Sequence, residues 1–240
     1  DRALFQHLVE AAENLLLDTQ VLEDRLDDDV ALCEFGIVER GCEQRGCGGS
    51  GGDRGLAYAG SVASLADSLW QRNRVIAEAA LEHRFVQGIA SGELARATFA
   101  YYVGQDAAFL DAFCRAYALA LAKSPDQDGL IAFRELLDAA ADELRLHRGY
   151  AARWDVDLHQ AADPATSAYT HFLLAVAALE PVGHIAAAMT PCMRLYAYLG
   201  QQLAAQTKPE SPYREWVMTY SSAQFEALLS RLGVGKDTTV

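Results

Sequence analysis

The apolar residues between about residues 61 and 233 recur at three- and four-residue steps, and this spacing constrains the fold more than any other feature. One such stripe, between residues 61 and 83, consists of Leu65, Leu69, Val75, Ile76, Ala79 and Ala80. Residues three or four apart lie on one face of an α-helix. No segment of useful length alternates apolar and polar residues as a half-buried strand does. We therefore predict an all-α fold, arranged as a compact helical bundle.

Short polar residues and glycines divide the first part of this region. Residues 87–93 contain two glycines and two small residues, and they predict a turn. Ser91 in this turn is a plausible N-cap for a long helix that ends near Lys123. A further helix is expected over residues 128–154, after the break that Pro125 introduces.

Prolines mark the later helix starts. Asp163–Pro164 and Glu180–Pro181 each precede an apolar helical stretch. A proline in the first helical turn loses no hydrogen bond, because its missing N–H would have no partner there. Ser211–Pro212 predicts the start of one last helix, which is expected to end at Gly233.

The first 60 residues differ in composition from the rest. An acidic part that can form one or two helices is followed by the glycine-rich residues 46–52, which are typical of a flexible linker. Three cysteines in this region lack the paired CxxC spacing of zinc sites. We expect residues 1–60 to be an N-terminal acidic segment and residues 61–240 to be a helical domain.

Charge and cysteine usage exclude several classes of protein. The net charge of −13 argues against a nucleic-acid partner. No apolar run is long enough to cross a bilayer, so no membrane partner is expected. Five cysteines are an odd number, and with no signal peptide in view they do not predict a disulfide scaffold. A soluble protein of the reducing cytoplasm is the expectation.

Cys192 directly follows Pro191 inside an apolar helical segment. Proline removes a backbone donor and crowds the carbonyl four residues back, so the helix is predicted to kink or loosen there. Tyr196 lies four residues on and shares the face of the thiol. A thiol at such a point can be a nucleophile, and it can equally be a small core residue, as most free cysteines are.

A carboxylate interrupts an aromatic stripe in the segment expected to form the long helix. The stripe consists of Phe99, Tyr102, Phe109, Phe113 and Tyr117, and Asp106 lies in its middle. A buried carboxylate must find hydrogen-bond donors to offset its desolvation. Asp106 is therefore either a hydrogen-bonded structural residue or a ligand for a polar nitrogen heterocycle, and the sequence leaves both interpretations open.

Tyr169 and Tyr220 lie among apolar residues on two other predicted helices. Each tyrosine alone is typical of a core whose hydroxyl is hydrogen-bonded. Together with Cys192, Asp106 and Tyr196 they place polar groups from four helices toward one interior. This combination predicts a closed pocket for a flat, polar, aromatic molecule.

Five segments in register resemble the TenA/THI-4 family over about residues 61 to 235. They are residues 83–94 (HRFVQGIASGEL), 99–106 (FAYYVGQD), 169–174 (YTHFLL), 190–196 (TPCMRLY) and 216–222 (WVMTYSS). Members of this family are thiaminase II-type aminopyrimidine aminohydrolases with the heme-oxygenase-like helical fold. The resemblance implies that fold and that function, in thiamine salvage.

The resemblance implies roles for two residues. Cys192 matches the family's nucleophile, which attacks the electron-poor pyrimidine ring. Asp106 matches the carboxylate that holds the ring nitrogen and the exocyclic amine. The implied reaction is hydrolysis of 4-amino-5-aminomethyl-2-methylpyrimidine to the hydroxymethyl compound, with thiamine cleavage as a related activity. No metal or organic cofactor is expected.

The resemblance also implies which residues form the wall of the pocket. Tyr169, Tyr196 and Tyr220 match tyrosines that stack on or hydrogen-bond the pyrimidine. Phe109 stands where many members have a tyrosine, so one hydroxyl near the thiol is absent. Family members are commonly homotetramers, and we expect the same here.

One further implication concerns the acid/base of the reaction. The family usually continues for about two more helices, and the last carries a glutamate in this role, whereas this chain ends at Val240. Three explanations are open: the chain is incomplete, the glutamate comes from elsewhere, or hydrolysis is impaired.

A di-iron oxidase of the same fold is an alternative. Glu143 and His147, and likewise Glu180 and His184, have the i, i+4 spacing that puts two metal ligands on one helix face. Glu143 and His147 also match a Glu-x-x-x-His pattern of the TenA/THI-4 family, and we interpret them as supporting residues.

A non-catalytic protein and a hydrolase of a different type are also compatible with the sequence. The chain could bind a pyrimidine or act in regulation without catalysis, although binding alone does not require Cys192. It could also be a Cys–His hydrolase that uses His147, His171 or His184, because helix packing decides which histidine meets the thiol.

Overall fold

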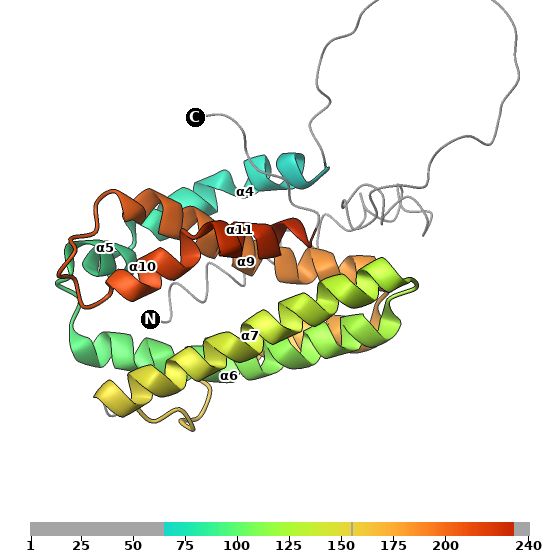
Figure 1. The fold of residues 1–240 in the computed structure, drawn as a ribbon, viewed down its shortest axis with the longest axis horizontal. Coiled ribbons are helices and arrows are strands. Elements are labelled where there is room, and N and C mark those ends of the chain that lie inside the picture. Colours follow the sequence, from blue (N-terminus) through green and yellow to red (C-terminus); the bar gives the residue numbers. More distant parts are fainter. Residues whose placement is uncertain (1–64, 155, 233–240) are drawn as a thin grey trace, which may run out of the picture.

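The computed structural model describes residues 65–154 and 156–232, and every regular element in these two ranges is an α-helix (Figure 1). The helices are α4 (Leu65–Glu82), α5 (Arg84–Ser91), α6 (Arg96–Lys123), α7 (Gln127–Trp154), α8 (Pro164–Leu179), α9 (Val182–Ala204), α10 (Arg214–Tyr220) and α11 (Ala223–Ser230). The all-α prediction is confirmed. The predictions for residues 1–60, including the acidic segment and the linker, lie outside the described ranges.

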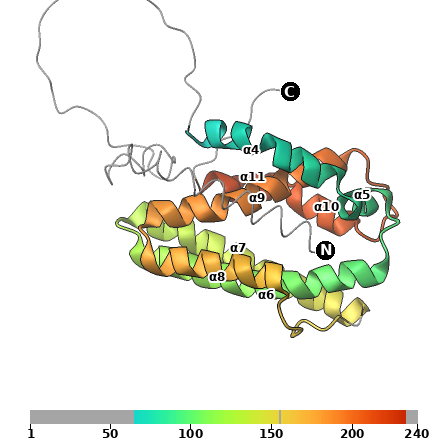
Figure 2. The same ribbon diagram turned by 180° about the vertical axis from the view of Figure 1, so that it is seen from behind.

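Two long helices and their neighbours form one layer of the bundle. α6 and α7 lie side by side along their length, and α8 packs against α6 on the face that Figure 2 shows. The second layer contains α4, α5, α9, α10 and α11 (Figure 1). α9 contacts α4, α6, α8, α10 and α11, so it joins the two layers. Side chains that α6, α7, α9 and α10 turn inward therefore meet between the layers.

Local sequence signals set several helix boundaries as predicted. Asp163 caps α8, since its carboxylate accepts a hydrogen bond from the Thr166 backbone N–H at 2.8 Å, and Pro164 is the first helical residue. α9 continues without interruption through Pro191. The loosening predicted at this proline therefore does not end the helix, and Cys192 lies within regular helix.

The turn predicted at residues 87–93 is present but begins later, because the break between α5 and α6 spans residues 92–95. α5 continues to Ser91, because its apolar face is buried in the core and this packing outweighs the low helix propensity of Gly88. Gly92 ends α5 with a φ of 76°, a left-handed conformation that glycine adopts without steric cost. Ser91 does not cap the next helix, and Ala95 occupies that position instead.

The prediction of a single last helix after Ser211–Pro212 is wrong, because two helices, α10 and α11, follow it. Ser222 starts the second one by accepting a hydrogen bond from the Phe225 backbone N–H at 3.1 Å. Gly200 of α9 lies against the junction, where an added Cβ would come within 2.6 Å of the Tyr220 carbonyl carbon. This close approach fixes the end of α10, and with it Tyr220, against α9.

None of the helices in the described ranges combines the length and the apolar character that spanning a bilayer requires.

Candidate active site

A cavity of about 630 Å³ lies among α6, α7, α9, α10 and α11. Its wall combines aromatic and aliphatic side chains with a thiol and four carboxylates, of which Asp142 and Glu215 are exposed and Asp106 and Glu143 lie further inside. The residues that matter for chemistry are Asp106, Phe109, Glu143, Cys192, Tyr196 and Tyr220. A mostly apolar cavity with a few convergent polar groups is the usual form of a small-molecule site.

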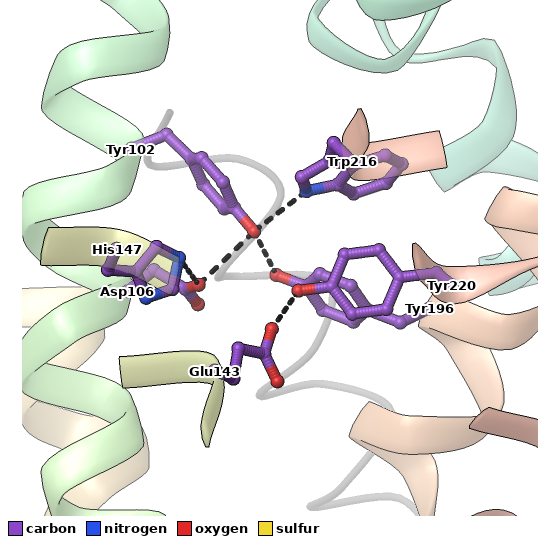
Figure 3. Close-up of polar contacts among 7 residues, drawn as sticks. All are labelled: Tyr102, Asp106, Glu143, His147, Tyr196, Trp216 and Tyr220. Atoms are coloured by element: carbon purple, nitrogen blue, oxygen red, sulfur yellow. Dashed lines mark hydrogen bonds and ion pairs between the residues drawn. The ribbon is translucent and has the colours of Figure 1, made fainter. Parts of the chain in front are cut away.

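Asp106 on α6 is buried, and its carboxylate is held by two donors. The Tyr102 hydroxyl donates to Oδ2 over 3.3 Å, and His147 Nε2 on α7 lies 3.2 Å from the same oxygen (Figure 3). These donors offset the desolvation of the carboxylate. Asp106 also lines the cavity. Both interpretations from the sequence therefore apply, because the residue is structurally satisfied and still faces a site.

Tyr102 connects three helices at the edge of the site. Its hydroxyl accepts a hydrogen bond from Trp216 Nε1 over 3.1 Å and lies 3.2 Å from the Tyr196 hydroxyl. Because the Tyr102 proton goes to Asp106, Tyr196 is the donor of that contact, and a relay runs from α9 through Tyr102 to the carboxylate (Figure 3). The sequence alone did not single out Tyr102 or Trp216 as site residues, although Tyr102 lies one turn before Asp106.

Glu143 on α7 is a second buried carboxylate of the site, and at the sequence level it was identified only as a supporting residue and as a candidate metal ligand. It accepts a hydrogen bond from the Tyr220 hydroxyl of α10 (Figure 3). Burial and the charge of Asp106 raise the pKa of Glu143, whereas the hydrogen bond from Tyr220 and the charge of His147 lower it, and the net pKa is about 7. The i, i+4 spacing to His147 was the available signal.

His147 lies beside both carboxylates. Burial lowers the pKa of His147, but the hydrogen bond and the charge of Asp106, together with the charge of Glu143, raise its net pKa above the usual value. The protonated imidazole is therefore more stable here than in a free histidine side chain. Of the three histidines considered for a Cys–His pair, His171 is exposed and His184 pairs with Glu180 at 3.3 Å. His147 directs its Nε2 at Asp106.

Cys192 lies in the cavity wall and is buried. Burial raises the pKa of the Cys192 thiol well above its usual value, and the charges of Asp106 and Glu143 raise it further. The side chain is consequently a neutral thiol near pH 7. Nucleophilic attack by this sulfur therefore requires a nearby group that accepts the proton.

Two predicted tyrosines form one end of the cavity. The rings of Tyr196 and Tyr220 pack edge to face with centroids 4.7 Å apart, and both line the cavity. Trp216 packs against both rings. These contacts fix the two rings before any ligand arrives, so the ligand does not have to order them.

Phe109 lies between Tyr169 and the cavity. Phe109 lines the cavity, and Tyr169 stacks on it with ring centroids 5.3 Å apart and an interplanar angle of 23°. Tyr169 itself is not part of the cavity wall. Its hydroxyl is buried and has no hydrogen-bond partner among the described residues. Of the six predicted site residues, only Tyr169 therefore lies outside the wall, with Phe109 between it and the cavity.

One group of side chains in the described ranges has the composition of a metal site. Ligand atoms of Asp106, Glu143 and His147 all lie within 4.8 Å of one another. Carboxylates and imidazole suit first-row transition metals. The second pair proposed for a di-iron centre, Glu180 and His184, is not part of this group. The two pairs therefore do not come together as that alternative requires.

Comparison with known proteins gives consistent matches. The TENA/THI-4/PQQC family model matches residues 70–234. The chain is 34% identical over 166 residues to the mitochondrial bifunctional TH2 protein of Arabidopsis thaliana, a match that covers 60% of this chain and 27% of the plant protein. It therefore spans about a quarter of that relative. It is 35% identical over 174 residues to an aminopyrimidine aminohydrolase of Halalkalibacterium halodurans, covering 69% of this chain and 77% of the relative.

The fold matches as well. A solved structure titled a TenA family transcription regulator, from Silicibacter sp. TM1040, superimposes with a TM-score of 0.64 at 30% identity, covering 70% of this chain and 77% of the other. The family match covers more than half of the chain and includes Asp106, Cys192 and Tyr220. From its sequence and its fold alike, this chain belongs to the TENA/THI-4/PQQC family.

Proposed function

We propose that this chain is an aminopyrimidine aminohydrolase of the thiaminase II type. It hydrolyses 4-amino-5-aminomethyl-2-methylpyrimidine to the hydroxymethyl compound and releases ammonia. The observation that carries the proposal is the presence of Cys192 and Asp106 in the wall of one cavity. The 35% identity to a relative named aminopyrimidine aminohydrolase supports the substrate class.

The cavity suits a flat ring with polar edges. Tyr196, Tyr220 and Phe109 supply aromatic surface. The Asp106 carboxylate, whose position is set by Tyr102 and His147, is the acceptor for a ring N–H and an exocyclic amine. A negative charge at this point stabilises the protonated ring, which is the form that a nucleophile attacks most readily.

Cys192 divides the displacement into two steps. Its sulfur adds to an electron-poor carbon of the protonated ring, and the C–S bond forms as the ring loses its aromaticity. The electron pair then expels the aminomethyl nitrogen as ammonia and leaves an exocyclic methylene group. Water adds to that methylene, the C–S bond breaks, and the aromatic ring returns. Water is consumed and ammonia is released, and the protein is regenerated.

A second candidate function is pyrimidine binding without chemistry. A solved relative titled a transcription regulator favours it. Binding would use Asp106 and the aromatic wall but would not need the thiol of Cys192. The two functions therefore differ in whether product forms and in whether Cys192 is required.

The test is incubation of the purified chain with 4-amino-5-aminomethyl-2-methylpyrimidine, with thiamine as a second substrate. Chromatography and mass spectrometry would follow the hydroxymethyl product, and an ammonia assay would follow the leaving group. We expect both to form in equal amounts, at a rate proportional to protein concentration. Tight binding of the pyrimidine with no product would establish the binding function instead.

The homotetramer implied by the resemblance and the cytoplasmic location inferred from cysteine usage remain predictions. Sedimentation velocity of the purified chain measures the first, and fractionation of the source cells measures the second.

A further inference from the structure

The proposed hydrolysis moves protons at four points. Cys192 enters as a neutral thiol and loses a proton, and the departing amine gains one. Water then loses a proton, and the sulfur regains one when it leaves. A single group that accepts and donates protons inside the cavity would serve all four events.

We propose that Glu143 is this acid/base, a catalytic role that rests on the proposed hydrolysis. Glu143 lines the same cavity as Cys192. Among the described residues it receives one hydrogen bond, from Tyr220, whereas two donors converge on Oδ2 of Asp106. Asp106 is therefore committed to position and charge. The other two carboxylates of the wall, Asp142 and Glu215, are exposed and pair with Arg145 and Arg153. Glu143 is the remaining carboxylate available for proton transfer.

The charged and titratable groups around Glu143 come from four helices. They are Tyr102, Asp106, Cys114 and Tyr117 on α6, His147 and Tyr150 on α7, Cys192 on α9 and Tyr220 on α10. The cavity wall also contains the charged side chains of Asp142 on α7 and of Arg214 and Glu215 on α10, and from α11 it receives the uncharged Gln224, Phe225 and Leu228. Burial and the nearby Asp106 outweigh Tyr220 and His147, so the pKa of Glu143 lies at about 7. Both protonation states of Glu143 are thus populated near neutral pH, as an acid/base requires.

The proton balance closes within the site. The Glu143 carboxylate accepts the thiol proton as the C–S bond forms, and it donates that proton to the amine as ammonia leaves. It next accepts a proton from the attacking water, and it returns this proton to the sulfur when the C–S bond breaks. Glu143 ends as it began, so no other proton donor is needed.

The first test is the pH dependence of kcat/KM and kcat for wild type and Glu143→Gln. Glutamine has nearly the same size and can still accept from Tyr220, but it cannot carry a proton. We expect kcat to fall at least about 100-fold, the ionisation near pH 7 to disappear from the profile, and the Kd for the hydroxymethyl product to change by less than about threefold. Glu143→Asp keeps a carboxylate and should retain more activity than Glu143→Gln.

Glu135→Gln is the matched control. Glu135 lies on the same helix, pairs with Arg231 at 2.9 Å and does not line the cavity, so this variant should behave as wild type. A Glu143→Gln protein with a wild-type profile and rate would overturn the proposal.

A second measurement is independent of turnover. Alkylation of Cys192 by iodoacetamide, followed by peptide mass spectrometry and compared with alkylation of Cys192 in Glu135→Gln, reports how readily the thiol loses its proton. If Glu143 accepts that proton, Glu143→Gln should slow alkylation of Cys192. If Glu143 acts only through its charge, its removal lowers the pKa of Cys192 and alkylation becomes faster, which would overturn the proposal. An inactive wild type with Glu143-dependent alkylation would overturn the hydrolase but support the proton transfer.

Discussion

His147 Nε2 on α7 lies 3.2 Å from Asp106 Oδ2 on α6, and both side chains are only 4% exposed. A charged pair in a buried position depends on its partners, because neither charge can turn to water. The pair also places a carboxylate with two donors at the cavity wall. Asp106 is consequently both a structural link between two helices and the expected anchor of a pyrimidine ring.

The substitution Asp106→Asn should abolish tight binding of the pyrimidine. It removes the charge that stabilises a protonated ring and leaves the His147 imidazolium without a carboxylate partner. We expect the Kd for the hydroxymethyl product, measured by calorimetry, to rise at least about 30-fold. Asp111→Asn is the control, since Asp111 lies on the same helix in an exposed pair with Arg115. Unchanged affinity in Asp106→Asn would remove Asp106 from the binding site.

The substitution Cys192→Ser should abolish hydrolysis while binding persists. Serine preserves the size and burial of the side chain, but its alcohol is a far poorer nucleophile than a thiolate. We expect product formation to fall below detection and the Kd for the pyrimidine to stay within about threefold of wild type. Cys114→Ser, at a half-buried position of α6 that does not line the cavity, should turn over normally. Normal turnover in Cys192→Ser would refute covalent catalysis by this residue.

The substitution Tyr220→Phe should shift the pH profile. The Tyr220 hydroxyl donates to the ionised form of Glu143 and thereby lowers the pKa of that carboxyl. Without the donor the pKa of Glu143 rises, so the ionisation near pH 7 in the kcat profile should move to higher pH. Tyr198→Phe, on a tyrosine of α9 that packs against Trp70, serves as the control. Movement to lower pH would contradict the assigned role of Tyr220.

Glu143→Gln should make the fold less sensitive to pH. The folded-state pKa of Glu143, about 7, lies above the usual 4.5. The native state therefore binds more protons than the unfolded state between these values, and stability falls as pH rises through this window. The difference corresponds to about 2 to 3 kcal/mol between pH 5 and pH 8.

Urea denaturation of wild type and Glu143→Gln at these two pH values measures this effect. We expect the variant to gain stability relative to wild type at the higher pH, whereas Glu135→Gln should follow wild type at both. Parallel curves for Glu143→Gln and wild type would show that Glu143 does not titrate in this window.

The substitution Gly200→Ala should disturb the α10–α11 junction. A Cβ at Gly200 would lie 2.6 Å from the Tyr220 carbonyl carbon and 2.7 Å from the Ser221 nitrogen, so backbone must move. We expect a loss of about 1–3 kcal/mol in stability and reduced activity, because Tyr220 moves with the junction. Gly149→Ala on α7 meets no atom within 4 Å and should stabilise slightly through helix propensity. Thermal denaturation measures the stability of both variants. Equal melting temperatures for Gly200→Ala and Gly149→Ala would contradict tight packing at Gly200.

Local sequence determined the helices and the helix starts that depend on nearby atoms. The Asp163–Pro164 start of α8 was predicted because a cap and a first-turn proline act within one helical turn. The ends of α5 and α10 were not predicted. They depend on burial of an apolar face and on contact with Gly200, which are interactions between segments distant in the sequence. Propensity alone does not contain such interactions.

The sequence also determined which residue types are available for chemistry, and the motifs pointed to Cys192, Asp106 and three tyrosines. Only the tertiary structure decided how these side chains are used. It placed Tyr169 behind Phe109, joined Tyr102 to Asp106, and brought Glu143 of α7 to Tyr220 of α10. The pKa of a buried carboxyl depends on burial and neighbouring charge, and both are set by packing between helices. A role for Glu143 in proton transfer was therefore invisible until α6, α7, α9 and α10 had been assembled around one cavity.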